Sequence, residues 1–156
     1  MLADCGSDRE RFGSYFATML AEGEAGTSVP FAQIDCATGE PVGVTTYMTL
    51  RPEHRALEIG GTWLGPSAWS TGINKEAKLL LLRHAFERVD CVRVEFKTDA
   101  LNERSRRALA ALPAQFEGIL RRYQVTQGGR HRDSAFYSVI AEEWPAVRSA
   151  LEQRLA

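Results

Sequence analysis

A loop that leads into a helix is the segment of the sequence best suited to binding an anion. Residues 65–72 contain glycine and small polar residues, and residues 73–88 follow with a helical pattern. The apolar side chains of that pattern recur at 3-4-3 spacing: Leu79, Leu82, Phe86 and Val89. Free backbone N–H groups and the helix dipole at such an N-terminus attract phosphate. Gly72 permits close backbone approach, and Thr71 and Asn74 suit capping. An ordinary turn has the same composition, so both interpretations stay open.

Other reactive residue types lack the spacing of a chemical site. The three cysteines, Cys5, Cys36 and Cys91, form no CxxC pair, which argues against a zinc ribbon or disulfide framework and favours a reducing cytoplasm. The three histidines show no metal-ligand spacing, so we expect no metal. Lys and Arg number 19 against 20 Asp and Glu, so charge-driven binding to nucleic acid or a membrane surface is not expected. Neither a signal peptide nor a run of about 18 apolar residues is present.

The hydrophobic patterns predict one α/β domain over residues 1–156, with a mixed, mostly antiparallel sheet. A chain of 156 residues with 44% hydrophobic content can bury one sizeable core. Helical periodicity predicts helices at residues 8–22, 73–88, 102–112 and 142–155. Alternating and β-rich runs predict strands at residues 29–36, 41–50, 55–64, 91–97, 116–125 and 134–141.

A glycine pair interrupts the third predicted strand. Gly60 and Gly61 lie inside residues 55–64, directly before the anion-binding loop. Glycine within a strand usually marks a β-bulge or a place where a ligand or another backbone comes close. The pair therefore predicts a local break in the strand next to the loop.

Several blocks of residues, in order, resemble one known family. They are Glu58–Leu64 (EIGGTWL), Thr71–Leu82 (TGINKEAKLLLL), His84–Phe86, Arg93–Asp99 with Asn102 and Ser105, Glu117–Arg121 (EGILR), and Arg132–Ser134 through Tyr137 and Ser138 to Glu143–Pro145. These blocks resemble the GNAT superfamily of N-acetyltransferases, and within it the ribosomal-protein N-acetyltransferases (the RimJ/RimL-like branch). The resemblance covers about residues 40 to 150.

The resemblance implies a GNAT fold in which two neighbouring parallel strands splay apart beside a bulge. The pantetheine arm of acetyl-CoA would lie in that gap, with its pyrophosphate on the loop. The family pattern there is Gln/Arg-x-x-Gly-x-Gly/Ala, whereas this chain has Trp69 and Asn74 at the first and last positions. The chain also begins at what resembles the family's second helix, so the first strand and helix are expected to be lacking. The implied cofactor-binding residues are Trp63, Leu64, Trp69, Ser70, Thr71, Gly72, Ile73, Asn74, Asn102 and Ser105.

The resemblance also assigns chemical roles. Glu58 is the candidate general base, with a salt-bridged strand glutamate as the alternative. Ser105 is the favoured acid for the departing thiolate, with an ordinary first-turn serine as the alternative. Tyr137 is the second candidate, with a packed strand tyrosine as the alternative. Asn102 would bond the pantetheine arm, or would cap the helix instead. Arg104, with Arg106 and Arg107, could approach the CoA 3′-phosphate or form a solvated face.

The expected function is transfer of acetyl from acetyl-CoA to an amine, either a protein N-terminus or a small molecule, by direct attack in a ternary complex. The resemblance is also compatible with a homodimer. Two alternatives remain: an acyl donor such as succinyl-CoA, and an acyl-CoA-binding module without turnover.

Overall fold

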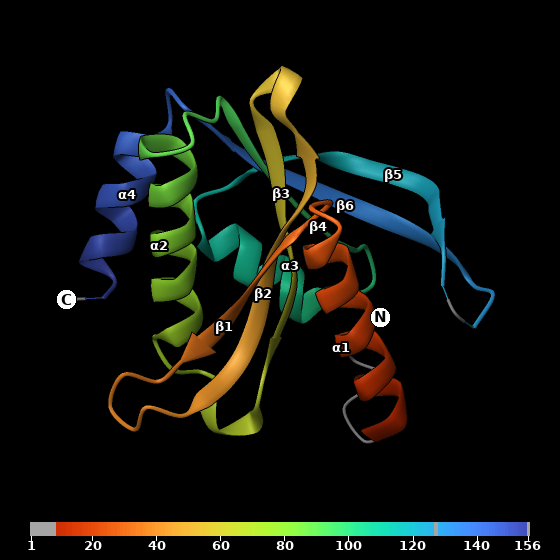
Figure 1. The fold of residues 1–156 in the computed structure, drawn as a ribbon. Coiled ribbons are helices and arrows are strands. Elements are labelled where there is room, and N and C mark those ends of the chain that lie inside the picture. Colours follow the sequence, from red (N-terminus) through yellow and green to blue (C-terminus); the bar gives the residue numbers. More distant parts are fainter. Residues whose placement is uncertain (1–8, 127, 156) are drawn as a thin grey trace.

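The computed structural model describes residues 9–126 and 128–155, and it forms one six-stranded sheet flanked by helices (Figure 1). The helices are α1 (Arg9–Glu24), α2 (Ile73–Glu87), α3 (Glu103–Ala111) and α4 (Trp144–Gln153). The strands are β1 (Val29–Ile34), β2 (Pro41–Arg51), β3 (Ala56–Leu64), β4 (Arg93–Asp99), β5 (Gln115–Val125) and β6 (His131–Ile140). Short 3-10 turns at Pro52–His54 and Pro66–Ala68 flank β3. The predicted order of helices and strands is confirmed.

The sheet is mixed, with the strand order β1-β2-β3-β4-β6-β5. Among the described strands only β3 and β4 pair in parallel, because α2 carries the chain from the end of β3 back to the start of β4. The pairs β1–β2, β2–β3, β4–β6 and β5–β6 are antiparallel. The predicted α/β class with a mostly antiparallel sheet is therefore confirmed.

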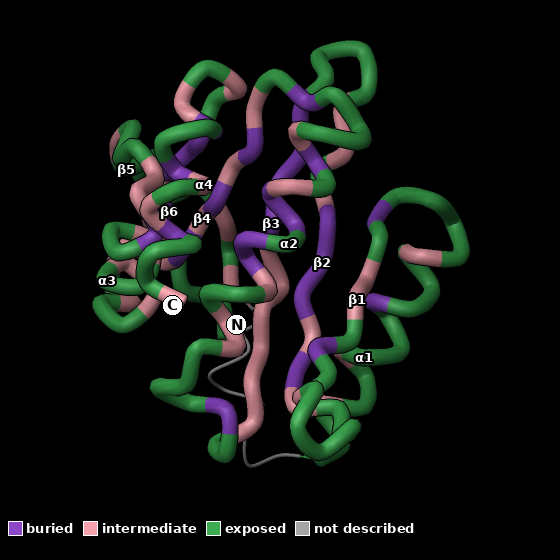
Figure 2. The backbone as a smooth tube through the Cα atoms, turned by 90° about the vertical axis from the view of Figure 1, so that its left-hand side faces the viewer, coloured by how far each residue is buried: buried purple, intermediate pink, exposed green. Residues whose placement is uncertain are grey.

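One face of the sheet holds the hydrophobic core. Along β4 the side chains alternate, so that Val94 and Phe96 are buried while Arg93, Glu95 and Lys97 point to the opposite face. Leu82 of α2 and Leu151 of α4 complete the core at 0% exposure. Figure 1 shows α2 and α4 side by side on this face and α1 on the other, and Figure 2 shows burial concentrated in the central strands.

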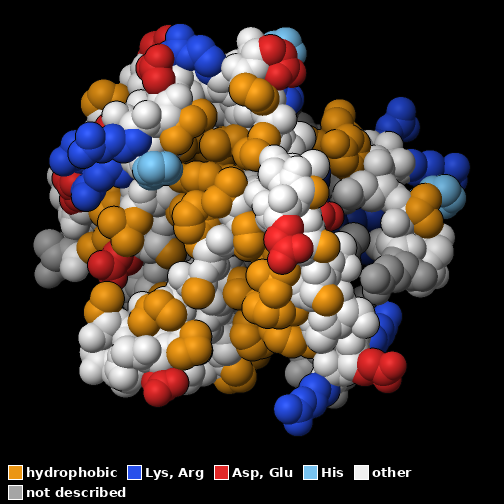
Figure 3. All heavy atoms as spheres, viewed as in Figure 1, with side chains coloured by type: hydrophobic (Ala, Val, Ile, Leu, Met, Phe, Trp, Pro, Cys, Tyr) orange, Lys and Arg blue, Asp and Glu red, His pale blue; other side chains and the backbone are white. Residues whose placement is uncertain are grey.

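Hydrophobic side chains also reach the surface beside the core. Figure 3 shows them gathered between α2 and β1 and over α1. The exposed large apolar residues of these three elements are Phe16, Leu20, Val29, Ile34 and Leu80. No helix in the described part of the chain is both long and apolar enough to cross a membrane.

Some boundaries differ from the predictions for reasons of backbone pairing. The strand predicted at 91–97 begins instead at Arg93, because the Cys91 N–H bonds the Ala85 carbonyl and closes the end of α2. The strand predicted at 134–141 begins at His131, because the polar residues before Ser134 pair with β5 in an extended hairpin. The sequence pattern detects side-chain burial, whereas these boundaries depend on backbone hydrogen bonds.

Candidate functional site

The two parallel strands separate soon after they pair. Their pairing joins Ala56–Glu58 to Arg93–Glu95, and both strands then continue, to Leu64 and to Asp99. Where two neighbouring strands are not paired, their free backbone N–H and C=O groups can form hydrogen bonds with an extended ligand. The predicted splayed pair is present, and it opens a gap between the second halves of β3 and β4.

A β-bulge lies on β3 at the start of this gap. The β2–β3 register shifts between Val44 and Thr46, where β3 contributes one residue more than β2. Gly61 has φ +58, a conformation that favours glycine, and a Cβ there would lie 2.9 Å from the Tyr15 hydroxyl. The bulge predicted from the glycine pair is confirmed.

The first turn of α2 begins at the end of the gap. Gly72 is its N-cap residue and supplies no side-chain hydrogen bond, so the helix amides are not capped in this way. The Thr71 hydroxyl donates to the Ala68 carbonyl at 2.8 Å and accepts only a long bond, 3.3 Å, from the Ile73 N–H. The buried Asn74 Oδ1 has no hydrogen-bond partner among the described residues. This helix start has the amide groups and dipole to hold an anion.

Trp69 connects the two sides of the gap. Its indole Nε1 donates to the carbonyl of Leu64, the last residue of β3, at 2.8 Å. The guanidinium of Arg104 lies 4.4 Å from the centre of the indole ring, a cation–π contact. Because α3 follows β4, this contact joins the end of one splayed strand to the helix that follows the other. The sequence predicted Arg104 either as a phosphate contact or as part of a solvated face, and its contact with Trp69 was not predicted.

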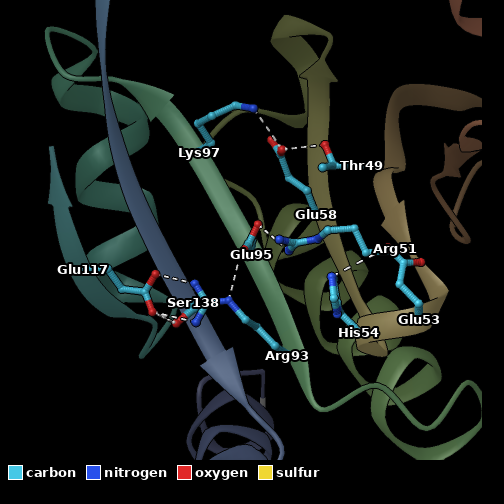
Figure 4. Close-up of polar contacts among 10 residues, drawn as sticks. All are labelled: Thr49, Arg51, Glu53, His54, Glu58, Arg93, Glu95, Lys97, Glu117 and Ser138. Carbon is cyan, nitrogen blue, oxygen red and sulfur yellow. Dashed lines mark hydrogen bonds and ion pairs between the residues drawn. The ribbon is translucent and has the colours of Figure 1, made fainter. Parts of the chain in front are cut away.

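Glu58 lies on the polar face, at the point where the strands begin to separate. Its carboxylate is almost buried at 4% exposure, and its Oε2 accepts hydrogen bonds from Lys97 Nζ at 3.0 Å and Thr49 Oγ1 at 3.1 Å (Figure 4). Glu58 is therefore an ion-paired glutamate that also stands beside the gap. Lys97 was not among the predicted residues, although its place in the β4 alternation put it on this face.

A chain of ion pairs extends from this point across the polar face (Figure 4). Glu95 forms an ion pair with Arg51 at 2.8 Å and accepts a hydrogen bond from Arg93 at 2.7 Å. Burial raises the pKa of the Glu95 carboxyl, but the two guanidinium groups outweigh it and lower that pKa below its ordinary value. Arg93 also binds Glu117, which accepts a further hydrogen bond from Ser138 at 2.7 Å. The Arg93 hydrogen bond lowers the pKa of Glu117. These pairs hold β4, β5 and β6 in register.

The acid candidates occupy different places. Ser105 is half-buried in the first turn of α3, where its N–H donates to the side chain of Asn102 at 3.0 Å. Asn102 thus caps the helix, which was the alternative interpretation. Tyr137 pairs with Phe96 and shares its core face, opposite to Glu58. The structure does not bring Tyr137 and Glu58 together.

A cavity of about 450 Å³ lies on the polar face between α1 and the strands β2 and β3. Gly61 forms part of its wall, so the cavity reaches the bulge. Met48 also lines the cavity, and its side chain lies against Gly60. A Cβ added at Gly60 would lie 3.0 Å from Glu58 Oε1. Residues 9–126 and 128–155 contain no group of three or more His, Cys, Asp or Glu side chains that could hold a metal ion. The cavity offers room for a second substrate beside the bulge.

Comparisons with known proteins agree with this geometry. The family model for the acetyltransferase (GNAT) domain matches residues 6–115. The uncharacterized N-acetyltransferase p20 of Bacillus licheniformis is 31% identical over 114 residues, 73% of this chain and 63% of the relative. The chain spans about three fifths of the length of the curated relatives it matches.

Solved structures show the same fold. A GCN5-related N-acetyltransferase from Brucella melitensis superposes with a TM-score of 0.87 at 31% identity, covering 97% of this chain and 66% of that one. Mycobacterium smegmatis RimJ, in complex with CoA-disulfide, superposes with a TM-score of 0.75 at 29% identity, covering 92% of this chain and 68% of that one.

Proposed function

This chain belongs to the GNAT acetyltransferase family, and from that premise we propose that it transfers an acetyl group from acetyl-CoA to an amine. The observation that carries the proposal is the parted β3–β4 pair followed by the first turn of α2, whose amides donate one long side-chain hydrogen bond, to Thr71. A gap between strands accommodates an extended arm, and a helix N-terminus accommodates a diphosphate. One ligand with both parts, coenzyme A, fits this arrangement.

The donor-binding residues follow from this placement. The amides of Gly72, Ile73 and Asn74 would hold the diphosphate, with Ser70 and Thr71 beside them. Backbone groups of Trp63 and Leu64 would line the gap on the β3 side, and Asn102 and Ser105 on the α3 side. Trp69, held by Leu64 and Arg104, covers the mouth of the gap. Acetyl-CoA supplies the acetyl group as an activated thioester.

The chain supplies positioning and proton transfer. An acceptor amine arrives mostly as ammonium, and a carboxylate attracts it and accepts its proton as the amine reacts. Glu58 is the candidate for this role because it stands where β3 and β4 part, and because it pairs across the β2–β3 ladder with Met48, which lines the cavity under α1. Amides that follow the bulge would donate hydrogen bonds to the acyl oxygen. Ser105, in the first turn of α3, would donate a proton from its hydroxyl to the departing thiolate.

The acceptor would enter through the cavity between α1 and the strands. The likeness to RimJ at 29% identity supports a protein N-terminus as one acceptor class, and small amines are the other. The free thiols of Cys36 and Cys91 support a reducing cytoplasm as the location. Cys5 lies outside the described residues.

A second function is favoured by one observation. The carboxylate of Glu58 is already ion-paired and nearly buried, which suits an acyl-CoA-binding module without turnover. Binding of CoA without an acetylated product would identify such a module.

The test is release of thiol from acetyl-CoA with a panel of amines and N-terminal peptides. We expect turnover with at least one acceptor, and we expect Glu58→Gln to lower kcat about a hundredfold. Glu53→Gln is the matched control, because Glu53 carries an exposed carboxylate on the turn before β3. A wild-type protein that does not bind CoA would overturn the proposed function, and full turnover by Glu58→Gln would remove Glu58 from it.

A further inference from the structure

A buried lysine joins α2 to the sheet behind the bulge. Lys78 lies in the second turn of α2 and is 6% exposed. Its Nζ donates hydrogen bonds to Thr62 Oγ1 at 2.8 Å and to Thr45 Oγ1 at 3.2 Å. The two hydroxyls also bond each other at 2.9 Å. The three side chains form a closed triangle between one helix and two strands.

This lysine is unfavourable for packing alone. No carboxylate among the described residues forms an ion pair with Lys78, although burying an amine without a counter-charge costs free energy. Burial lowers the pKa of its amine to about 7. A methionine of similar length would fill the same space without that cost. Buried ionisable groups of this kind gather at functional sites.

The triangle lies at the interruption of the β2–β3 ladder. Thr62 directly follows Gly61, the residue with positive φ. Thr45 has no paired residue on β3, because the β2–β3 register shifts between Val44 and Thr46. Lys78 therefore holds both strands at the bulge, from the same helix whose first turn would bind the diphosphate.

We propose that Lys78 is a positioning residue of the acyl-donor site: by holding Thr62 and Thr45 it sets the backbone of the bulge, and so the direction of the amides that meet the acyl oxygen. The inference rests on the proposed function, because it assumes that the gap beside the bulge receives the thioester. Lys78 touches no reacting atom. It acts through Thr62 and the backbone that follows Gly61.

Steady-state kinetics with acetyl-CoA test this role. We expect Lys78→Met and Thr62→Val each to lower kcat by about ten- to a hundredfold, since small displacements of reacting groups cost that much. The KM for acetyl-CoA should change little, because the first turn of α2 is intact. In backbone NMR spectra, the amide signals of Gly61 and Thr62 should shift in Lys78→Met.

Tyr47→Phe is the matched control. The Tyr47 hydroxyl donates to the Leu81 carbonyl, so this variant also loses a buried hydrogen bond between β2 and α2, but one that involves neither Thr45 nor Thr62. Arg88→Met, an exposed cation lost at the far end of α2, is the second control. Both should keep the wild-type kcat.

The outcomes distinguish the positioning role of Lys78 from the proposed acetyl transfer. A kcat loss in Lys78→Met and Thr62→Val, with both controls active, supports the positioning role. Wild-type turnover by Lys78→Met, or an equal loss in Tyr47→Phe, overturns it. A wild-type protein that binds no CoA overturns the proposed function as well, whereas a failure confined to Lys78→Met leaves that function standing.

Discussion

The Lys97 ammonium and the Glu58 carboxylate lie 3.0 Å apart, one on each of the two strands that separate. Glu58 belongs to the last registered pair of β3 and β4, and Lys97 lies two residues beyond its partner Glu95. The ion pair therefore spans the start of the gap, with side chains only 5% and 13% exposed. Such a pair joins the strands at the point where their backbone pairing ends.

Removing one member of this pair should cost more than removing both. Lys97→Met leaves a nearly buried carboxylate without its cation, and we expect a loss of about 3 kcal/mol in the free energy of unfolding. The double variant Glu58→Gln/Lys97→Met should recover at least about 1 kcal/mol of that loss. Urea denaturation of the wild type, Glu58→Gln, Lys97→Met and the double variant gives the coupling free energy between the two residues. Additive losses would show that the two residues do not interact in solution.

The acid should be Ser105 rather than Tyr137. Ser105 lies in the first turn of α3, next to Arg104, which contacts Trp69 after the end of β3, whereas Tyr137 lies on the core face of β6, where Arg106 contacts its hydroxyl. We expect Ser105→Ala to lower kcat by about ten- to a hundredfold and Tyr137→Phe to lower it less than about threefold. Acetylation rates at saturating acetyl-CoA measure both. A larger loss of kcat in Tyr137→Phe than in Ser105→Ala would make Tyr137 the proton donor to the thiolate.

Gly61 should be required for donor binding and not only for stability. Its φ of +58 strains any other residue, and an added Cβ meets the Tyr15 hydroxyl. Gly61→Ala should lose about 1–2 kcal/mol of stability and about tenfold in affinity for CoA, measured by calorimetry. Gly39→Ala is the control, because Gly39 has φ +74 in open space at the β1–β2 turn. An equal loss of affinity in both variants would contradict the prediction.

The contact of Trp69 with Arg104 should report donor binding. Trp69 contacts both the end of β3 and Arg104 of α3, so an arm that enters between β3 and α3 should change the surroundings of the indole. We expect CoA to change tryptophan fluorescence in the wild type, and Trp69→Phe to lose most of that change. A signal that survives in Trp69→Phe would come from another tryptophan and would place the donor elsewhere.

Much of the fold was predictable because its signals are local. The alternation along β4 separates Val94 and Phe96 from the polar face. The 3-4-3 spacing places Leu79 and Leu82 on the buried face of α2, whereas Val89 lies beyond the helix and is exposed. The glycine pair predicted the bulge for the same reason, since a positive φ limits the choice of residue. These features need no knowledge of distant parts of the chain.

The polar partners in the site were not predictable in the same way. That Lys97 meets Glu58 depends on the parallel register of two strands, which no local pattern encodes. The face on which Tyr137 lies depends likewise on its pairing with Phe96. Lys78 was missed because a lysine within a helix is expected to be exposed, and only the threonines at the bulge explain its burial.

The buried amine of Lys78 should make stability depend on pH. Its pKa is about 7 in the folded protein and 10.5 as an ordinary lysine, so between these values the unfolded chain binds the additional proton. The contribution of Lys78 to the free energy of unfolding therefore rises with pH from 7 towards 10.5, by at most about 1.4 kcal/mol per pH unit. Below pH 7 both states are protonated, and the group contributes no pH dependence.

Comparison with Lys78→Met isolates this contribution. Burial raises the pKa of Cys91 and of Tyr47, so these two groups act in the opposite direction at higher pH, but equally in both proteins. Between pH 7 and 9 the wild type should gain about 2 kcal/mol relative to Lys78→Met in urea denaturation. Parallel pH profiles would mean that the amine is solvated and charged in the folded protein. The hydrogen bonds of Lys78 with Thr45 and Thr62 would then not form in solution.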